Sequence, residues 1–139
     1  MSGNVTFSII KPGATGKKQA GDILSQIEHA GFEIKALKKL KLTEELAKKF
    51  YLVHQNRPFY EGLVNYMTSG PVYAMILEKN NAVMDFRKLI GATNPDEAEE
   101  GTIRKKFATS VQDNAVHGSD SDENALIESS FFFCELERF

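Results

Sequence analysis

Alternating and helical spacings of apolar residues divide the N-terminal part of the chain into short elements. Residues 5–10 are β-branched and aromatic and end at Pro12, which predicts a buried strand. Residues 19–30 carry apolar side chains at helical spacing and stop at Gly31, which predicts a helix. Residues 32–42 mostly alternate and predict a half-exposed strand. Its apolar residues are expected to share one face: Phe32, Ile34, Ala36, Leu40 and Leu42.

The pattern continues with two helices, a strand and a third helix. Thr43, ahead of two glutamates, predicts the N-cap of the first of these helices. Pro58 predicts the first residue of the next helix, which stops at Gly70. Residues 72–78 are almost continuously apolar and predict a buried strand, and residues 81–90 predict a further helix.

The periodicity breaks down between residues 91 and 124. Only residues 102–107 indicate a short helix there, and so long an aperiodic stretch in a compact domain is either functional or misread. Beyond it the pattern predicts a helix at 121–130 and a last strand at 131–136. The order of elements predicts an α/β (α+β) fold, a ferredoxin-like sandwich. Its four-stranded, mostly antiparallel sheet is expected to have helices packed on one face.

Composition and charge narrow the function classes. The 139 residues, 42% hydrophobic and 26% charged, predict one globular domain, 1–139. A net charge of −2 argues against a polyanion as the main partner, so no nucleic acid is required. We expect no membrane partner, because no run approaches the ~20 apolar residues of a membrane span. The segment 1–13 lacks the features of a signal peptide.

A single cysteine, Cys134, lies in an apolar run and is interpreted as a core or strand residue. One cysteine excludes an intrachain disulfide and fits a reducing compartment. We therefore expect a cytoplasmic location.

Basic residues in three separate segments are candidates for a phosphate site. Lys11 follows the first strand, Arg87 lies in a predicted helix, and Arg104 lies in the aperiodic stretch. A planar guanidinium binds phosphate oxygens as a fork and a lysine acts as a point charge, so the three could clamp a polyphosphate. Thr93 could add a hydroxyl. The alternative is that each merely solvates the surface. The sequence contains no P-loop, dinucleotide-binding or protein-kinase motif.

His117 lies in "NAVHGSDSDEN" and is the histidine of greatest chemical interest. Neutral imidazole is available as a nucleophile near pH 7, but a solvated loop histidine is the other interpretation. A nucleophilic ring needs a partner on its second nitrogen, and Glu128 and Ser119 are candidates. His29 and His54 are interpreted as structural. The spacing of the histidines does not match common metal-ligand motifs.

Five segments, in order, resemble the nucleoside diphosphate kinase family and cover essentially the whole chain. "NAVHGSDS" resembles the active-site signature of that family, and "FSIIKPG" its first strand and lysine. "RPFYEGLVNYMTSGPV" resembles its nucleotide-binding helix hairpin. "LIGATNP" and "GTIRKKF" resemble its phosphate-binding loop.

The resemblance implies a kinase that transfers the γ-phosphate of a nucleoside triphosphate, mainly ATP, to a nucleoside diphosphate. It implies a ping-pong relay through a phosphohistidine on His117. Mg²⁺ would enter with the nucleotide, and Asp120 would contact it through water. The implied catalytic residues are His117, Lys11, Tyr51, Ser119 and Glu128. The implied nucleotide-binding residues are Lys11, Phe59, Leu63, Arg87, Thr93, Arg104, Val111 and Asn114.

The resemblance also implies weak base discrimination and self-assembly. Phe59 would stack on the base, and stacking uses only a π-face, so different bases should bind similarly. Family members form tetramers or hexamers, so a homotetramer or homohexamer is expected. Two positions depart from the family pattern: Gly13 stands where an acid is usual, and Lys17 where an arginine is common. We expect these to change loop stability or oligomer contacts rather than to abolish activity.

Two other functions remain as alternatives. A regulatory nucleotide-binding module could use the same scaffold without catalysis, because a fold does not dictate function. Such a sensor would need no nucleophile. A phosphohistidine carrier charged by another protein would need an exposed histidine and a docking patch, but no aromatic ring beside a nucleobase.

Overall fold

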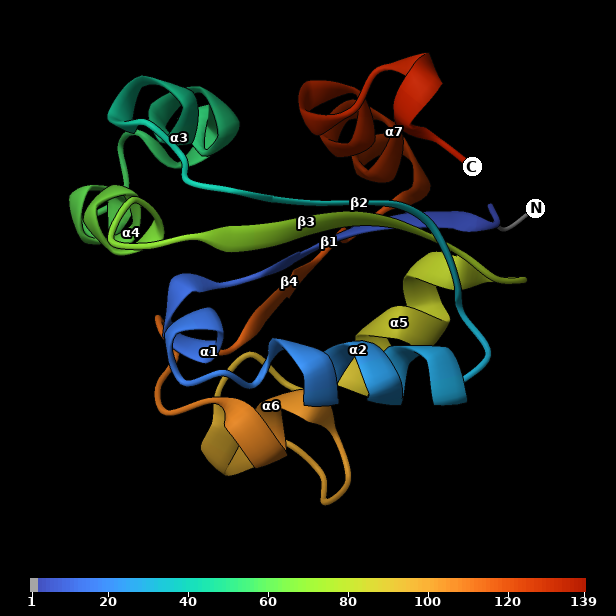
Figure 1. Ribbon diagram of the computed structural model, residues 1–139. Helices are drawn as coiled ribbons and strands as arrows, with labels where there is room; N and C mark the ends of the chain where they lie inside the picture. Colours follow the sequence, from blue (N-terminus) through green and yellow to red (C-terminus); the bar gives the residue numbers. More distant parts are fainter. Residues whose placement is uncertain (1–2) are drawn as a thin grey trace.

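A four-stranded antiparallel sheet runs through the middle of the molecule (Figure 1). The computed structural model describes residues 3–139, so the first two residues of the segment compared with a signal peptide lie outside the described residues. The strand order is β2-β3-β1-β4, and all three neighbouring pairs are antiparallel. This sheet with its packed helices confirms the predicted ferredoxin-like α/β (α+β) fold. The strands are β1 (Val5–Ile10), β2 (Glu33–Leu40), β3 (Val72–Glu78) and β4 (Val116–Gly118).

Helices cover both faces of the sheet, so the expectation of a single covered face is wrong (Figure 1). One face carries α1 (Pro12–Gly16), α2 (Ala20–His29), α5 (Ala82–Ile90) and α6 (Ile103–Phe107). The other carries α3 (Glu44–Phe50), α4 (Tyr60–Met67) and α7 (Asp122–Phe132). The physical reason lies in the central strands, which are apolar on both sides. Ile9 and Ile10 are adjacent and both fully buried, and they belong to different cores. No helix within residues 3–139 has the length and apolarity needed to cross a membrane.

A bulge in β2 overturns the expectation that its apolar residues share one face. Ile34 pairs with Leu77 while Ala36 pairs with Ile76, so the strand gains one residue at Lys35. Side chains alternate with a period of two, and one extra residue moves the following ones to the opposite face. Phe32 and Ile34 therefore pack beside α2 and α5, whereas Ala36, Leu40 and Leu42 pack on the α3, α4 and α7 side.

The last strand is not at 131–136, as the sequence predicted, but at β4 within the aperiodic stretch. Phe131 and Phe132 instead extend α7, and the Phe132 ring stacks on Phe7 of β1 with centroids 5.1 Å apart. The aromatic run has strand propensity, but packing of α7 on the sheet outweighs it. The chain then forms the 3₁₀ turn η3 (Glu135–Glu137). Cys134 before it is exposed, so its interpretation as a core or strand residue is wrong.

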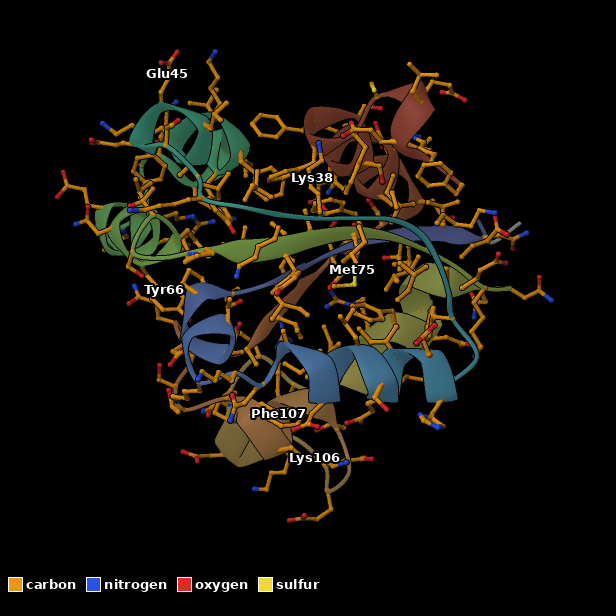
Figure 2. All side chains as sticks on the ribbon, in the orientation of Figure 1. Lys38, Glu45, Tyr66, Met75, Lys106 and Phe107 are labelled. Carbon is orange, nitrogen blue, oxygen red and sulfur yellow. The ribbon has the colours of Figure 1, made fainter. Side chains whose placement is uncertain are left out.

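Local signals placed the starts of the predicted helices to within two residues, whereas α1, at Pro12–Gly16, was not predicted. Thr43 caps α3, since its side-chain oxygen accepts a hydrogen bond from the Leu46 N–H at 3.1 Å. Pro58 does not begin α4, which starts at Tyr60. The turns η1 (Leu52–His54) and η2 (Pro95–Glu97) complete the fold. Figure 2 shows Met75 on the α2 side of the sheet and Lys38 on the α7 side.

Candidate active site around His117

His117 lies on β4, the strand at one edge of the described sheet. It is in register with Ile9 of β1, so its ring points to the α3 and α7 side, where the rings of Phe7 and Phe50 lie 6.1 Å and 5.8 Å from it between centroids. The Nε2 of His117 is 2.8 Å from Oε1 of Glu128 on α7. Nδ1 makes no hydrogen bond to residues 3–139. The arrangement therefore holds one ring nitrogen and leaves the other free.

Ser119 fixes the carboxylate that holds this ring. It is fully buried, and its hydroxyl donates to Glu128 Oε1 at 2.7 Å while accepting from the Phe7 N–H at 3.2 Å. The hydrogen bonds thus run from β1 through Ser119 and Glu128 to His117. A hydrogen-bonded carboxylate of this kind orients an imidazole and selects its tautomer.

The backbone just before β4 is strained, and a hydrogen bond connects it to the backbone of Lys11. Ala115 has φ = 73°, and the Val116 N–H donates across it to the Asn114 carbonyl at 2.9 Å, which closes a γ-turn. The Ala115 carbonyl accepts from the Lys11 N–H at 2.8 Å. A non-glycine residue in this conformation costs roughly 1–2 kcal/mol, and such strain clusters at functional sites.

Lys11 is a buried cation. The residue is 7% exposed, and burial, followed by the nearby positive charge of Arg104, lowers the pKa of its ammonium group to about 8. The negative charge of Asp113 opposes part of this lowering. A buried cation has a strong need for an anionic partner, which a phosphate group would satisfy.

Arg87, Thr93 and Arg104 line one cavity of about 520 Å³ at the ends of α5 and α6. Arg104 donates from Nη1 to the Gly91 carbonyl at 3.0 Å and from Nη2 to the Val116 carbonyl at 2.9 Å. Burial, and next the charge of Arg87, lower the pKa of Arg104 to about 10. The structure thus brings these three predicted residues together and ties Arg104 to the residue before His117.

The lining of this cavity also includes residues that the sequence did not single out. Glu97 and Glu99 contribute carboxylates, although their acidic segment resembled an ordinary solvated loop. Their only sequence signal was their position between Thr93 and Arg104. The cavity is therefore of mixed charge.

Other predicted residues lie outside the lining of that cavity. Tyr51 is buried with no partner for its hydroxyl among residues 3–139, and burial, with the charge of Glu128 next, raises its pKa. Asn114 is also buried, and its Oδ1 is likewise unpaired within the described chain. Leu63 is half-buried. Phe59 and Val111 are 49% and 55% exposed. The Phe59 ring lies 5.3 Å from His54 between centroids.

The donor groups of residues 3–139 do not form a metal site built by the protein alone. Within residues 3–139 there is no cluster of three or more His, Cys, Asp or Glu residues suited to a metal ion. Asp120 is exposed, and its Oδ1 accepts from Asn124 Nδ2 at 2.6 Å, while its Oδ2 makes no hydrogen bond to residues 3–139. The structural role of His29 stays a prediction, and its Nδ1 lies 2.7 Å from the Ser25 carbonyl of its own helix.

Comparisons with known proteins agree on one family. A model of the family described as nucleoside diphosphate kinase matches residues 4–138. The nucleoside diphosphate kinase of Flavobacterium psychrophilum is 57% identical over the full length of both chains. That of Chlorobaculum tepidum is 57% identical over 132 residues, which are 95% of this chain and 94% of the relative.

Solved structures agree with these relatives. The Aquifex aeolicus nucleoside diphosphate kinase superposes with a TM-score of 0.96 at 43% identity, covering 98% of this chain and 99% of that one. The Halobacterium salinarum enzyme, solved in complex with CDP, gives 0.94 at 35% identity, covering 99% and 91%. The chain therefore belongs to the nucleoside diphosphate kinase family, whose members are phosphotransferases.

Proposed function

We propose that the chain, as one domain of residues 1–139, transfers the γ-phosphate of a nucleoside triphosphate, mainly ATP, to a nucleoside diphosphate by a ping-pong mechanism. The phosphoryl group would rest on His117 between the two half-reactions. The observation that carries the proposal is the 2.8 Å contact between His117 Nε2 and Glu128 Oε1. Because an ionised carboxylate accepts the Nε2 proton, the lone pair of the neutral ring lies on Nδ1.

In the first half-reaction Nδ1 of His117 attacks the γ-phosphorus, and the bond to the leaving diphosphate breaks. The ring becomes positively charged as the new N–P bond forms, and Glu128 stabilises that charge through Nε2–H. Ser119 keeps Glu128 in place. In the second half-reaction a terminal oxygen of the diphosphate attacks the phosphorus, the N–P bond to Nδ1 breaks, and His117 regains its neutral form.

The cationic residues are proposed to neutralise the transferred group. Lys11 and the Tyr51 hydroxyl would reach phosphate oxygens beside His117, and both side chains are already buried, which favours preorganised charge. Arg87, Thr93 and Arg104 would bind the β- and γ-phosphates in the cavity that they line. Asn114, whose Oδ1 lacks a partner in the described chain, would accept from the ribose.

The base would bind on the exposed face of Phe59, with Leu63 and Val111 as the walls of an apolar slot. Stacking on a ring makes no base-specific hydrogen bond, so purines and pyrimidines should both be accepted. The CDP present in the Halobacterium salinarum structure is consistent with a pyrimidine acceptor for this chain as well.

A magnesium ion carried by the nucleotide suits this site better than one held by the protein. Such an ion would supply positive charge in addition to that of Lys11, Arg87 and Arg104. Asp120, exposed and only three residues beyond His117, would hold a water molecule of that ion. We also propose a cytoplasmic location and a homotetramer or homohexamer.

Replacing the nucleophile tests the proposal. His117→Ala should lower kcat/KM by about 10⁴-fold or more while ATP still binds, because the clamp residues remain in place. Steady-state transfer rates and ATP titration by calorimetry would measure the two effects. His29→Ala is the matched control, since its ring bonds only within α2. Appreciable transfer by His117→Ala would overturn the nucleophile assignment.

Titrations with ATP and with adenosine, together with detection of phosphohistidine after ATP is added, separate the two alternatives. A regulatory module predicts tight ATP binding by the unaltered protein with no phosphohistidine. A phosphohistidine carrier predicts a histidine that is phosphorylated by a partner protein, but no affinity for adenosine. The proposed kinase predicts both phosphohistidine formation and adenosine binding.

A further inference from the structure

A hydrogen-bonded cluster beside Lys11 has no part in the function proposed so far. The Gly13 N–H donates to the Tyr66 hydroxyl oxygen at 3.0 Å, and the Tyr66 hydroxyl donates to Oδ1 of Asp113. Oδ2 of Asp113 accepts from the Thr109 hydroxyl at 2.7 Å. Both carboxylate oxygens are thus engaged. Figure 2 shows Tyr66 between α4 and α1, so the cluster joins these two helices to the loop that carries Asp113.

This cluster connects the two walls of the proposed base slot. Phe59 and Leu63 precede Tyr66 at the start and in the middle of α4. Val111 belongs to the loop that Asp113 anchors. The loop also packs directly on α4, because a Cβ at Gly62 would lie 3.0 Å from the Gln112 side-chain nitrogen. The Tyr66–Asp113 bond therefore fixes the separation of the two walls.

The same carboxylate also acts on Lys11, whose pKa is lowered mainly by burial. The charged groups that act on Lys11 are Arg104 on α6, which disfavours its protonated form, and Asp113, which favours it. Lys17 also faces Asp113, with its Nζ 4.0 Å from Oδ2, but this lysine is half exposed. Asp113 is thus the anion that opposes the loss of charge at a buried lysine.

Gly13 makes room for the cluster. A Cβ at this position would overlap Asp113 Oδ1 and lie 2.7 Å from the Tyr66 hydroxyl oxygen. Because side chains at such distances must move, any other residue here would displace the carboxylate or the phenol. The departure of Gly13 from the family pattern therefore has a structural counterpart in the position of Asp113.

We propose that Asp113 is a positioning residue: through Tyr66, Thr109 and Gly13 it sets the width of the base slot and places a negative charge beside Lys11. The inference rests on the proposed function, because it takes Lys11 and the slot as parts of the nucleotide site. Asp113 itself does not touch the reacting atoms. Its charge and its bond to Tyr66 are separable, and each has its own effect on nucleotide binding.

ATP binding measured against pH in a His117→Ala background tests the proposal, because binding there needs no nucleophile. Asp113→Asn keeps the shape of the side chain but removes its charge. We expect the alkaline loss of ATP affinity to move to lower pH, so that affinity at pH 8 falls by about 5- to 10-fold. Tyr66→Phe keeps the charge but breaks the bond to Asp113. It should weaken the affinity for ATP by about 3- to 10-fold at every pH, and the pH at which affinity falls on the alkaline side should not change.

Asp22→Asn, an exposed change on α2, is the matched control. An Asp113→Asn profile that follows this control would overturn the electrostatic role, and unchanged affinity in Tyr66→Phe would overturn the slot-setting role. Should Asp113→Asn fail to fold, Tyr66→Phe still decides the second role, and Asp113→Ser in the same titration decides the first, since it also removes the carboxylate. If the protein with His117 intact forms no phosphohistidine, the proposed function fails while these binding effects remain measurable.

Discussion

Several polar groups around His117 are buried without partners in the described chain. They are the Tyr51 hydroxyl, Arg104 Nε and Asn114 Oδ1. Each unsatisfied buried group destabilises a fold by roughly 1–3 kcal/mol. The site is thus less stable than a fully paired interior, and a bound polyanion that pairs with these groups would stabilise the protein by linkage.

At the scale of single residues, Lys11 gives the first prediction. Its pKa of about 8 in the folded chain lies below the 10.5 of an unperturbed lysine, so the unfolded chain binds more protons between these values. The free energy of unfolding of the nucleotide-free protein should therefore rise as pH increases from 8 to 10. Tyr51 and Tyr66, whose pKa values are raised, oppose this rise only above pH 10. Lys11→Met should be more stable at pH 7 and lose the rise, while transfer is abolished.

Urea unfolding at pH 7, 8 and 10, with Lys79→Met as the control, would measure this. Lys79 is a partly exposed lysine paired with Asp85, so its removal should leave the rise intact. A flat stability profile in the parent protein, or an equal rise in Lys11→Met, would contradict the description of Lys11 as a buried cation.

At the level of elements, the end of α5 and the start of α6 act together on Arg104. Gly91 ends α5 with φ = 88°, and its carbonyl accepts from Arg104. Thr102 caps α6, accepting from the Lys105 N–H, and a Cβ at Gly91 would lie 2.6 Å from the Thr102 hydroxyl oxygen. One glycine therefore permits both the close approach of the two helices and the placement of an arginine.

Gly91→Ala should weaken ATP binding as well as stability. Positive φ alone costs about 1–2 kcal/mol for alanine. The contact of the added methyl group with Thr102 would also displace the backbone at residue 91, and Arg104 would move with the carbonyl to which it donates. Gly101→Ala is the matched control, because Gly101 has φ = 89° but an added methyl group would meet no neighbouring atom there. We expect similar backbone strain in both variants, with lower ATP affinity only in Gly91→Ala. Equal ATP affinities in samples shown to be folded would refute the coupling of Gly91 to Arg104.

The elements also show where pattern reasoning succeeds. Long periodic segments such as α2 and α5, and the capped start of α3, follow from local chemistry and were predicted. β4 was not, because three residues are too few to show a period and its stability comes from pairing with β1. The bulge at Lys35 was hidden for a similar reason, since it arises from pairing with β3 and leaves no mark on the alternation of β2 itself.

At the scale of the whole molecule, the sheet separates two cores and presents His117 at one edge. The candidate site gathers side chains from segments as distant as Lys11 and Glu128. Residue types alone did not decide whether His117 is a solvated loop residue or a nucleophile. Its grouping with the phosphate-binding residues Arg87, Thr93 and Arg104 came from the family resemblance. The Tyr66–Asp113 bond was not predicted, because it joins residues 47 positions apart that carry no shared motif.

The proposed assembly is a prediction at the same scale. β2 forms the other edge of the described sheet and exposes Leu37, and Leu136 and Phe139 of the C-terminal segment are 88% and 86% exposed. The Phe139 N–H donates to the Lys35 carbonyl at this edge at 2.6 Å, but β2 pairs with no strand other than β3 among residues 3–139. Apolar groups beside such an edge favour pairing with another chain. Light scattering after gel filtration should give the mass of four or six chains, and Leu37→Lys should lower it. A monomer at micromolar concentration would contradict the proposed assembly.

The most direct test of the central claim is the intact mass of the protein after mixing with ATP and Mg²⁺ in the absence of an acceptor. The account predicts one added phosphoryl group per chain, labile in acid, absent in His117→Ala and removed on addition of GDP. Tight ATP binding with no added mass, or a phosphoryl group that persists in His117→Ala, would contradict a relay through His117.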